Sequence, residues 1–318
     1  MAQKDCLVSV VITTKNEVKN IATCIKAVQS STHQNWEVIV VDNSSSDGTS
    51  DVALTYTNKV FDKGPERSAQ RNFGMIECAE GKYVIYLDAD MIISPQLLDD
   101  CLKMIEKTNC VALHIHERIL GRGYWSKVRD FERSFYSGTS IDGARFFDRQ
   151  HFAAVGGFDE ELFKYGSGED WDIDKKLSNV GTIGLLAERS TTRMAGSWPL
   201  KKLICDNVVN LDPYFCGIYH NETTFNVPAY VRKKFYYSAG FEGYVKKWGA
   251  EDPDIKRQLG LGYRFFGVFL EKGKWKKFCL KPRLVAGLYA LRLLVGLAYA
   301  FRLFGFEAKN IRGLKSTK

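Results

Sequence analysis

The first half of the chain alternates short β-branched runs with amphipathic segments. Three runs predict strands, at residues 7–13, 36–41 and 83–87. Between the first two, Ile21, Cys24, Ile25 and Val28 recur at three- and four-residue steps, which is typical of a helix with one buried face. Strands that alternate with helices predict an α/β fold, in which a mostly parallel central sheet is flanked by helices.

Polar residues follow each predicted strand. Thr13 and Thr14 close the first, Asp42 and a turn of Asn, Ser, Asp and Gly close the second, and Asp88 closes the third. Ser94, as a cap before Pro95, should then open a helix. Because ligands of open α/β sheets bind beyond the carboxyl ends of the strands, these clusters are expected to share one crevice.

The triplet Asp88-Ala89-Asp90 places two carboxylates at the end of an apolar strand. Oxygen ligands of this kind suit Mg²⁺ or Mn²⁺, which keep positions open for the phosphates of a substrate. A solvated acidic turn is the alternative interpretation of the same three residues.

Composition narrows the possibilities only a little. The 318 residues are 45% hydrophobic and 26% charged, as in an ordinary globular protein, and the net charge of +8 favours anionic partners. Eight cysteines without a Cys-x-x-Cys pair argue against a zinc site and indicate reduced thiols, hence the cytosol. The short apolar run near the N-terminus does not fit a signal peptide.

The character of the chain changes after His220, where Lys, Arg and aromatic residues interleave as far as Arg312. We place a domain boundary near Pro228, between an N-terminal α/β domain (1–228) and a basic, aromatic helical region (229–318). Residues 284–306 are long enough to cross a bilayer, but Arg292 and Arg302 count against an easy crossing. Helices lying in the membrane surface are the prediction, with a helix buried on the sheet or a true span as alternatives.

Six segments of the chain resemble, in order, the motifs of the family 2 glycosyltransferases, whose catalytic domain has the GT-A nucleotide-sugar-binding fold. They are residues 10–17, 40–49, 71–74, 88–90, 156–160 and 168–172. The likeness covers roughly residues 7 to 180, and it divides the catalytic domain into a donor half (about 1–115) and an acceptor half (about 116–228).

The resemblance implies a nucleotide-diphosphate sugar as donor and a divalent metal, Mn²⁺ or Mg²⁺. The donor-binding residues that it implies are Thr13, Glu17, Asp42, Asn43, Arg67, Arg71 and Asp88. Those implied at the metal are Asp88, Asp90 and His220, although a lone histidine is often structural. Lys15 and Asn43 differ from the residues that many members carry, so the nucleobase stays open.

On the acceptor side, Asp170 is the candidate base, and its placement in the family implies inversion by direct displacement. Glu169 is the second candidate, or it holds hydroxyl groups of the acceptor. Capping of a helix start is the structural alternative for Asp170. Asp172 and Asp174 are expected to face solvent, and residues 186–215 to form an acceptor loop.

The expected function is transfer of one sugar to an acceptor hydroxyl or phosphate, lipid-linked or on a glycan, at the cytoplasmic face of a membrane. The processive synthases of the superfamily carry a Gln-x-x-Arg-Trp sequence, which does not occur here. A sugar nucleotidyltransferase is an alternative, although the opening loop lacks its glycines. A catalytically silent scaffold is another, and no aromatic signature of nucleic-acid binding is evident.

Overall fold

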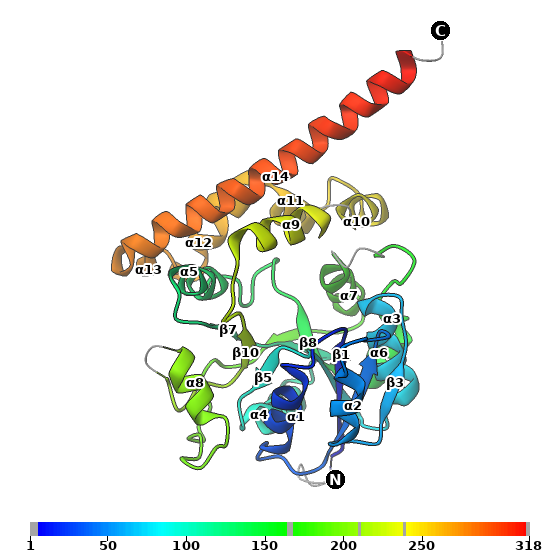
Figure 1. The fold of residues 1–318 in the computed structure, drawn as a ribbon, viewed down its shortest axis with the longest axis vertical. Coiled ribbons are helices and arrows are strands. Elements are labelled where there is room, and N and C mark those ends of the chain that lie inside the picture. The colour runs from blue at the N-terminus through cyan, green and yellow to red at the C-terminus, as the bar shows by residue number, and fades with distance from the viewer. Residues whose placement is uncertain (1–5, 164–167, 209–210, 238–239, 316–318) are drawn as a thin grey trace.

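The computed structural model describes residues 6–163, 168–208, 211–237 and 240–315, the last of these without side chains beyond residue 300. Its centre is a seven-stranded sheet in the order β3-β2-β1-β4-β8-β6-β9 (Figure 1). The strands are β1 (Val8–Thr14), β2 (Trp36–Asp42), β3 (Val60–Asp62), β4 (Tyr83–Asp88), β6 (Ala112–His114), β8 (Ala144–Asp148) and β9 (Ile183–Leu185).

The sheet is mostly parallel, as the alternation of strands and helices predicted. β1 pairs in parallel with both β2 and β4, and the register sets Thr13 opposite Asp88 and Thr14 opposite Asp42. Only β8 runs antiparallel to its neighbours, β4 and β6. The three predicted strands are confirmed to within one residue at each end.

The sequence did not predict a second sheet, which has three strands. It joins β5 (Met91–Ile93), β10 (Ile218–Asn221) and β7 (Glu117–Leu120), with β10 between the other two. β10 pairs with β5 so that His220 lies opposite Met91, and the amide of Asn221 donates to the carbonyl of Asp90 at 2.9 Å. His220, which is 130 residues later in the chain than Asp90, is thereby fixed beside the Asp88-Ala89-Asp90 triplet.

Helices flank the sheets on both sides. In the first 220 residues the helical segments are α1 (Ile21–Gln29), α2 (Thr49–Leu54), α3 (Arg67–Asn72), η2 (Phe73–Cys78), α4 (Leu97–Thr108), α5 (Tyr124–Arg133), α6 (Arg149–Ala154), α7 (Glu169–Ser178) and α8 (Lys201–Asn207). The predicted apolar stripe of α1 is buried. The helix predicted after Ser94 begins at Leu97 with Gln96 at its cap position, while Ser94 Oγ instead accepts from the amide of Gly217 at 3.1 Å.

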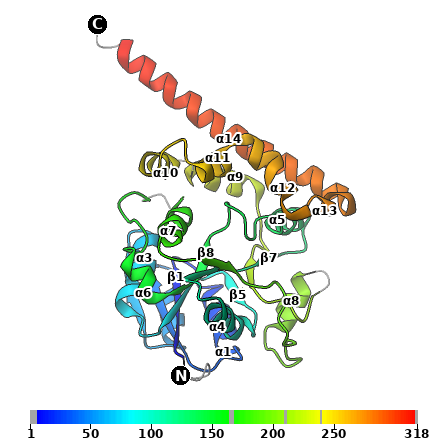
Figure 2. The same cartoon turned by 180° about the vertical axis from the view of Figure 1, so that it is seen from behind.

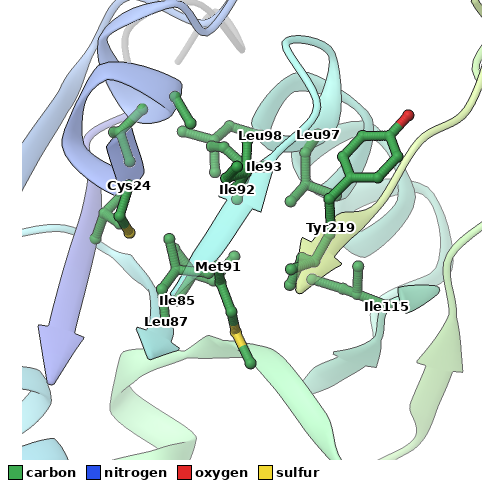
Figure 3. Close-up of a cluster of buried hydrophobic side chains, with 14 of the residues drawn as sticks. Cys24, Ile85, Leu87, Met91, Ile92, Ile93, Leu97, Leu98, Ile115 and Tyr219 are labelled. Atoms are coloured by element: carbon green, nitrogen blue, oxygen red, sulfur yellow. The ribbon is translucent and has the colours of Figure 1, made fainter. Parts of the chain in front are cut away.

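The main hydrophobic core lies between the sheets and helices α1 and α4. Figure 3 shows part of it: Cys24 of α1 and Tyr219 of β10 lie on opposite sides of β5, and Ile93 of β5 lies beside Leu98 of α4. Leu87 of β4 belongs to the same cluster. All five side chains are buried. Strand β5 is therefore held by α1 on one side and by β10 on the other. This packing fixes the segment that follows the Asp88-Ala89-Asp90 triplet.

The C-terminal part forms a helical layer over the carboxyl ends of the strands (Figures 1 and 2). Its segments are α9 (Val227–Tyr237), α10 (Phe241–Trp248), α11 (Pro253–Leu259), η4 (Tyr263–Gly267), α12 (Val268–Leu270), η5 (Glu271–Gly273), α13 (Lys276–Leu280) and α14 (Pro282–Lys315). The helix α14 packs on α9 and α5, and a separate apolar cluster, with Phe135, Phe269 and Leu288 at its centre, joins the layers. The predicted boundary near Pro228 falls in the first turn of α9.

Arg292 shows how α14 is attached. Its side chain is buried, with Nε 3.2 Å from Glu132 Oε1 and Nη2 donating to the hydroxyl of Tyr136 at 2.7 Å. The charge that argued against a membrane span is therefore paired with α5 in this structure. Arg302 lies beyond the side chains that the structure describes.

Candidate active site

A cavity of about 490 Å³ lies where the carboxyl ends of β1 and β4 face helices α5, α7 and α9. Its position agrees with the crevice that the strand ends predicted. Its charged lining residues are Lys15, Glu17, Arg67, Arg71, Asp88, Asp90, Glu117, Arg129, Arg133, Arg145, Asp170, His220, Glu222, Lys233 and Lys234.

Asp88 stands at the end of β4. Its Oδ1 lies 3.4 Å from both Thr13 Oγ1 and Arg71 Nη2. Burial disfavours the charged form of this side chain, but Arg71 and Arg145 outweigh that cost and hold the pKa of the carboxyl well below its usual range. The carboxylate is therefore available as a ligand at any physiological pH.

Asp90 follows two residues later and turns one oxygen to His220. The distance from Oδ2 to His220 Nε2 is 3.0 Å, whereas Oδ1 is buried and has no hydrogen-bond partner among the described residues. An uncompensated buried carboxylate oxygen is costly, and a cation would satisfy it. The structure thus places Asp88, Asp90 and His220, the residues expected at the metal, in one cavity.

Three such side chains do not by themselves make a preformed metal centre. Within the described ranges, no group of three or more His, Cys, Asp or Glu side chains is arranged to hold an ion. The site therefore fits Mg²⁺ or Mn²⁺ only if oxygen atoms of a bound substrate supply the remaining ligands. Magnesium sites at phosphates are commonly built in this way.

Arg71 links the two halves of the cavity. Its helix, α3, is capped by Glu66, whose side chain accepts from the amides of Ser68 and Ala69 and so fixes the first turn. The buried guanidinium lies 4.0 Å from the ring centroid of Tyr86, with Nη1 3.1 Å from Asp170 Oδ1. Since Nη2 contacts Asp88, one arginine connects the candidate base to the candidate metal ligand.

Asp170 lies in the first turn of α7, as predicted. The helix begins after Gly168, whose φ of 91° is a left-handed conformation that favours glycine. Asp170 Oδ1 accepts from the hydroxyl of Tyr86 at 2.9 Å in addition to Arg71. The side chain is 36% exposed and lines the cavity, so a carboxylate with a fixed orientation faces the space that a substrate would fill.

Glu169, the second candidate for the base, points elsewhere. It is buried, does not line the cavity, and its Oε1 lies 3.0 Å from Arg67 Nη2 and 3.6 Å from Arg71 Nη1. Burial raises the pKa of this carboxyl more than Arg67 lowers it. The contacts of Glu169 are therefore those of a residue that positions Arg67 and Arg71.

The predicted donor-binding residues fall into two groups. Thr13, Glu17, Arg67 and Arg71 line the cavity, and burial raises the pKa of Glu17. Asp42 and Asn43 do not line it. Asp42 Oδ2 accepts from the amide of Ser45 and the hydroxyl of Ser50, both at 2.8 Å, and Asn43 Nδ2 donates to the carbonyl of Pro65 at 2.8 Å.

Two expectations about neighbouring residues were wrong. Asp172 is fully buried, where its Oδ1 accepts from Trp248 Nε1 at 2.7 Å, and Asp174 Oδ2 lies 2.7 Å from His114 Nε2. Both carboxylates therefore join α7 to other segments of the fold instead of facing solvent. None of the described residues of 186–215 lines the cavity either; Trp198 and Ile204 of that segment belong to the main core.

The sequence did not predict one charged cluster of the cavity lining. Arg145 Nε donates to Glu117 Oε1 at 2.6 Å, and Arg133 Nη2 lies 2.9 Å from Glu117 Oε2. Burial would raise the pKa of Glu117, but Arg133 and Arg145 lower it to about 2. These residues come from β7, α5 and β8, and no local pattern in the sequence connects them. Only the basic, aromatic segment of α9 carried a signal, and its Tyr230, Lys233, Lys234 and Tyr237 also line the cavity.

Comparison with known proteins finds a family and several relatives that this chain resembles. Residues 9–159, a little under half of the chain, match the family described as Glycosyl transferase family 2. Two relatives named uncharacterized glycosyltransferases, from Rickettsia felis and Rickettsia conorii, are 29% identical over 208 residues and 31% over 205. Each alignment covers 60% of this chain, and the chain spans about a third of the length of these relatives, 34% and 33%.

Solved structures show the same fold. The mannosyltransferase PcManGT from Pyrobaculum calidifontis, in complex with GDP-Man and Mn²⁺, aligns over 98% of this chain and 88% of its own with a TM-score of 0.51 at 16% identity. TarS 1-349 of S. aureus, in complex with UDP, aligns over 92% and 88% with a TM-score of 0.50 at 17% identity.

The solved structures thus show that the chain has a GT-A-like α/β fold. Within it, residues 9–159 are similar to the family described as Glycosyl transferase family 2.

Proposed function

We propose that this chain transfers one sugar from a nucleotide-diphosphate sugar to a hydroxyl or phosphate of its acceptor, with inversion at the anomeric carbon. The observation that carries the proposal is the contact of Arg71 with both Asp170 and Asp88. It sets a carboxylate that lines the cavity beside the strand ends where a donor diphosphate would bind.

Asp170 is the proposed general base for a hydroxyl acceptor. As the acceptor oxygen forms its bond to the anomeric carbon, the bond from that carbon to the diphosphate breaks, and the acceptor proton passes to Asp170. Tyr86 and Arg71 occupy Oδ1, which leaves Oδ2 to receive the proton. A single base with direct displacement gives inversion.

Asp88, Asp90 and His220 would hold Mn²⁺ or Mg²⁺ together with the diphosphate of the donor. The unpartnered buried Oδ1 of Asp90 supports this assignment. The metal, when bound, neutralises charge on the departing diphosphate. Arg71 and Arg67 lie on the same side of the cavity, where their guanidinium groups suit phosphate oxygens.

Thr13 and Glu17 are proposed to contact the nucleoside of the donor. Asp42 and Asn43 would act by fixing the loop after β2, because their side chains are engaged within it. Lys15, the residue that follows strand β1, also lines the cavity.

The C-terminal layer is proposed to lie on the cytoplasmic face of a membrane and to bring the site to a lipid-linked or glycan acceptor. Pro282–Ala300 is long and apolar enough to cross a bilayer, with a mean hydropathy of 1.4, but length and composition alone are weak evidence for a span. The support for surface attachment comes from exposed apolar side chains that cluster in this layer. They are Leu261, Phe266, Leu270, Trp275, Leu280, Leu293, Leu294 and Leu297.

The test is the thermal stability of the purified chain with a panel of nucleotide-diphosphate sugars, with and without Mn²⁺. Because a ligand stabilises the folded state that binds it, one nucleotide should raise the midpoint of unfolding, and more so with Mn²⁺. If no member of the panel changes the midpoint under either condition, the proposed donor site is wrong.

A further inference from the structure

Two cations flank one aromatic ring in the wall of the cavity that lies opposite the strand ends. Tyr230 of α9 has the guanidinium carbon of Arg129 4.7 Å from its ring centroid and Nζ of Lys234 5.5 Å from it. All three side chains line the cavity. This wall is distinct from the floor where Asp88 and Asp90 lie.

Lys234 lacks a counter-ion within the part of the chain that the structure describes. Among the described residues, no carboxylate lies within 4.0 Å of its Nζ and no acceptor is hydrogen-bonded to it, whereas Arg129 Nε lies 3.5 Å from Glu222 Oε2 and Arg129 also pairs with Glu132. Burial, with Arg129 and Arg264 nearby, lowers the pKa of Lys234 to about 7. A partly buried ammonium beside like charges is unfavourable unless an anion joins it.

An apolar groove lies between two segments of the same helical layer. It has a volume of about 390 Å³ and is lined by Leu261, Phe265, Phe266, Leu293 and Leu297, together with two glycines. Residues of η4 and of α14 form its two sides.

The segment η4 connects the groove to the cavity. Phe265 and Phe266 line the groove, while the guanidinium carbon of the preceding Arg264 lies 5.5 Å from the ring centroid of Trp171. Trp171 lines the cavity. A molecule with an anionic head and an apolar chain would match both environments within one turn of the chain.

We propose that the acceptor is such an amphiphile, with a phosphate group bound by Lys234 and Arg129 and a hydrocarbon chain in the groove between η4 and α14. The inference rests on the proposed transferase function and adds the chemical class of the acceptor. The donor diphosphate is a poorer occupant of this wall, because Arg67 and Arg71 already serve the side near Asp88.

The experiment measures binding, so it does not depend on sugar transfer. Farnesyl phosphate, inorganic phosphate and farnesol are titrated into the wild-type chain and into Lys234→Gln by calorimetry. Loss of a charge-assisted contact should weaken farnesyl phosphate and inorganic phosphate roughly tenfold or more, while Lys234→Arg keeps most of the affinity. Arg232→Gln is the matched control, because Arg232 is exposed on the same helix and does not line the cavity.

Leu293→Glu separates the two parts of the proposal. It should weaken farnesyl phosphate and leave inorganic phosphate unchanged, since Leu293 lines only the groove. Equal binding of farnesyl phosphate and inorganic phosphate to the wild-type chain would overturn the assignment of the groove. If Lys234→Gln instead weakens binding of a nucleoside diphosphate as strongly as that of farnesyl phosphate, the wall belongs to the donor and the inference is wrong, whereas the proposed transferase function would stand.

Discussion

The hydroxyl of Tyr86 donates a hydrogen bond of 2.9 Å to Oδ1 of Asp170. Tyr86 is buried on β4, the strand that ends in Asp88, whereas Asp170 starts α7. One strand therefore carries a candidate metal ligand at its end and, two residues earlier, a side chain that orients the candidate base. The two proposed chemical roles are thereby linked through the central strand of the seven-stranded sheet.

The backbone behind Asp170 leaves no room for a side chain. A Cβ at Gly143 would stand 2.8 Å from Asp170 Cβ, so Gly143→Ala should displace the carboxylate. We expect sugar transfer to fall roughly tenfold to a hundredfold, because small misplacements of a catalytic group have effects of this size. The turnover rate of the variant is the measurement.

Gly196→Ala is the control for that substitution, since a Cβ there meets nothing within 4 Å. An alanine at 143 that transfers sugar as fast as the wild type would show that the position of Asp170 is not critical.

The role of Asp90 as a metal ligand predicts a selective loss. Asp90→Asn removes a ligand charge, and the gain in nucleotide affinity that Mn²⁺ provides should disappear while the fold stays intact. Titration of the nucleotide with and without Mn²⁺ measures it, with the exposed Asp51→Asn as control. A Mn²⁺-dependent affinity that survives in Asp90→Asn would rule out this ligand.

Much of this arrangement followed from local sequence. The strands that end at Thr14, Asp42 and Asp88 have apolar, β-branched patterns, and the start of α7 has acidic residues after a glycine, so their positions could be predicted. Glu117 and Arg145 could not, because the pair joins β7 to β8 across 28 residues and depends on how the strands stack. The same holds for the second sheet, whose strands of three and four residues carry too little pattern to recognise.

The burial of Asp172 is a second feature that the local sequence could not predict. Its place on a helix suggested a solvated charge, and only the packing of α10 against α7, through Lys247 and Trp248, reverses that prediction. Partners that arrive some 75 residues later leave no trace in the sequence around the aspartate.

Attachment of α14 predicts a specific response to acid. Burial would raise the pKa of Glu132, but Arg129, Arg292 and Tyr136 together lower it to about 2 from the ordinary value of 4.5. A carboxyl whose pKa is depressed by folding stabilises the folded state above pH 4.5, and this contribution is lost as the pH falls toward 2. The free energy of unfolding should therefore fall over that window.

Glu132→Gln should flatten part of this dependence and lower stability at neutral pH by about 3 kcal/mol, because it leaves a buried Arg292 without its charge partner. Chemical unfolding at several pH values measures both effects. The exposed Glu251→Gln is the control, and an unchanged slope in Glu132→Gln would exclude this carboxyl as the source.

Membrane attachment predicts binding to anionic vesicles through the exposed face of α13. Leu280 is 79% exposed beside Lys276 and Lys281, so Leu280→Glu should reduce co-sedimentation with vesicles of anionic lipid. Leu54→Glu, on a comparably exposed leucine of α2, should not. If the wild-type chain does not co-sediment with such vesicles, surface attachment is refuted.

The central claim is that Asp170 takes the proton of the acceptor in a cavity that binds a nucleotide-diphosphate sugar. The most direct measurement is the transfer rate of Asp170→Asn with the donor and metal that stabilise the wild-type chain, alongside its affinity for that donor. The rate should fall by about a hundredfold or more with donor affinity nearly unchanged, as expected for loss of a general base. Retained activity in Asp170→Asn, with Glu169→Gln inactive but folded, would contradict the account and move the base to its neighbour.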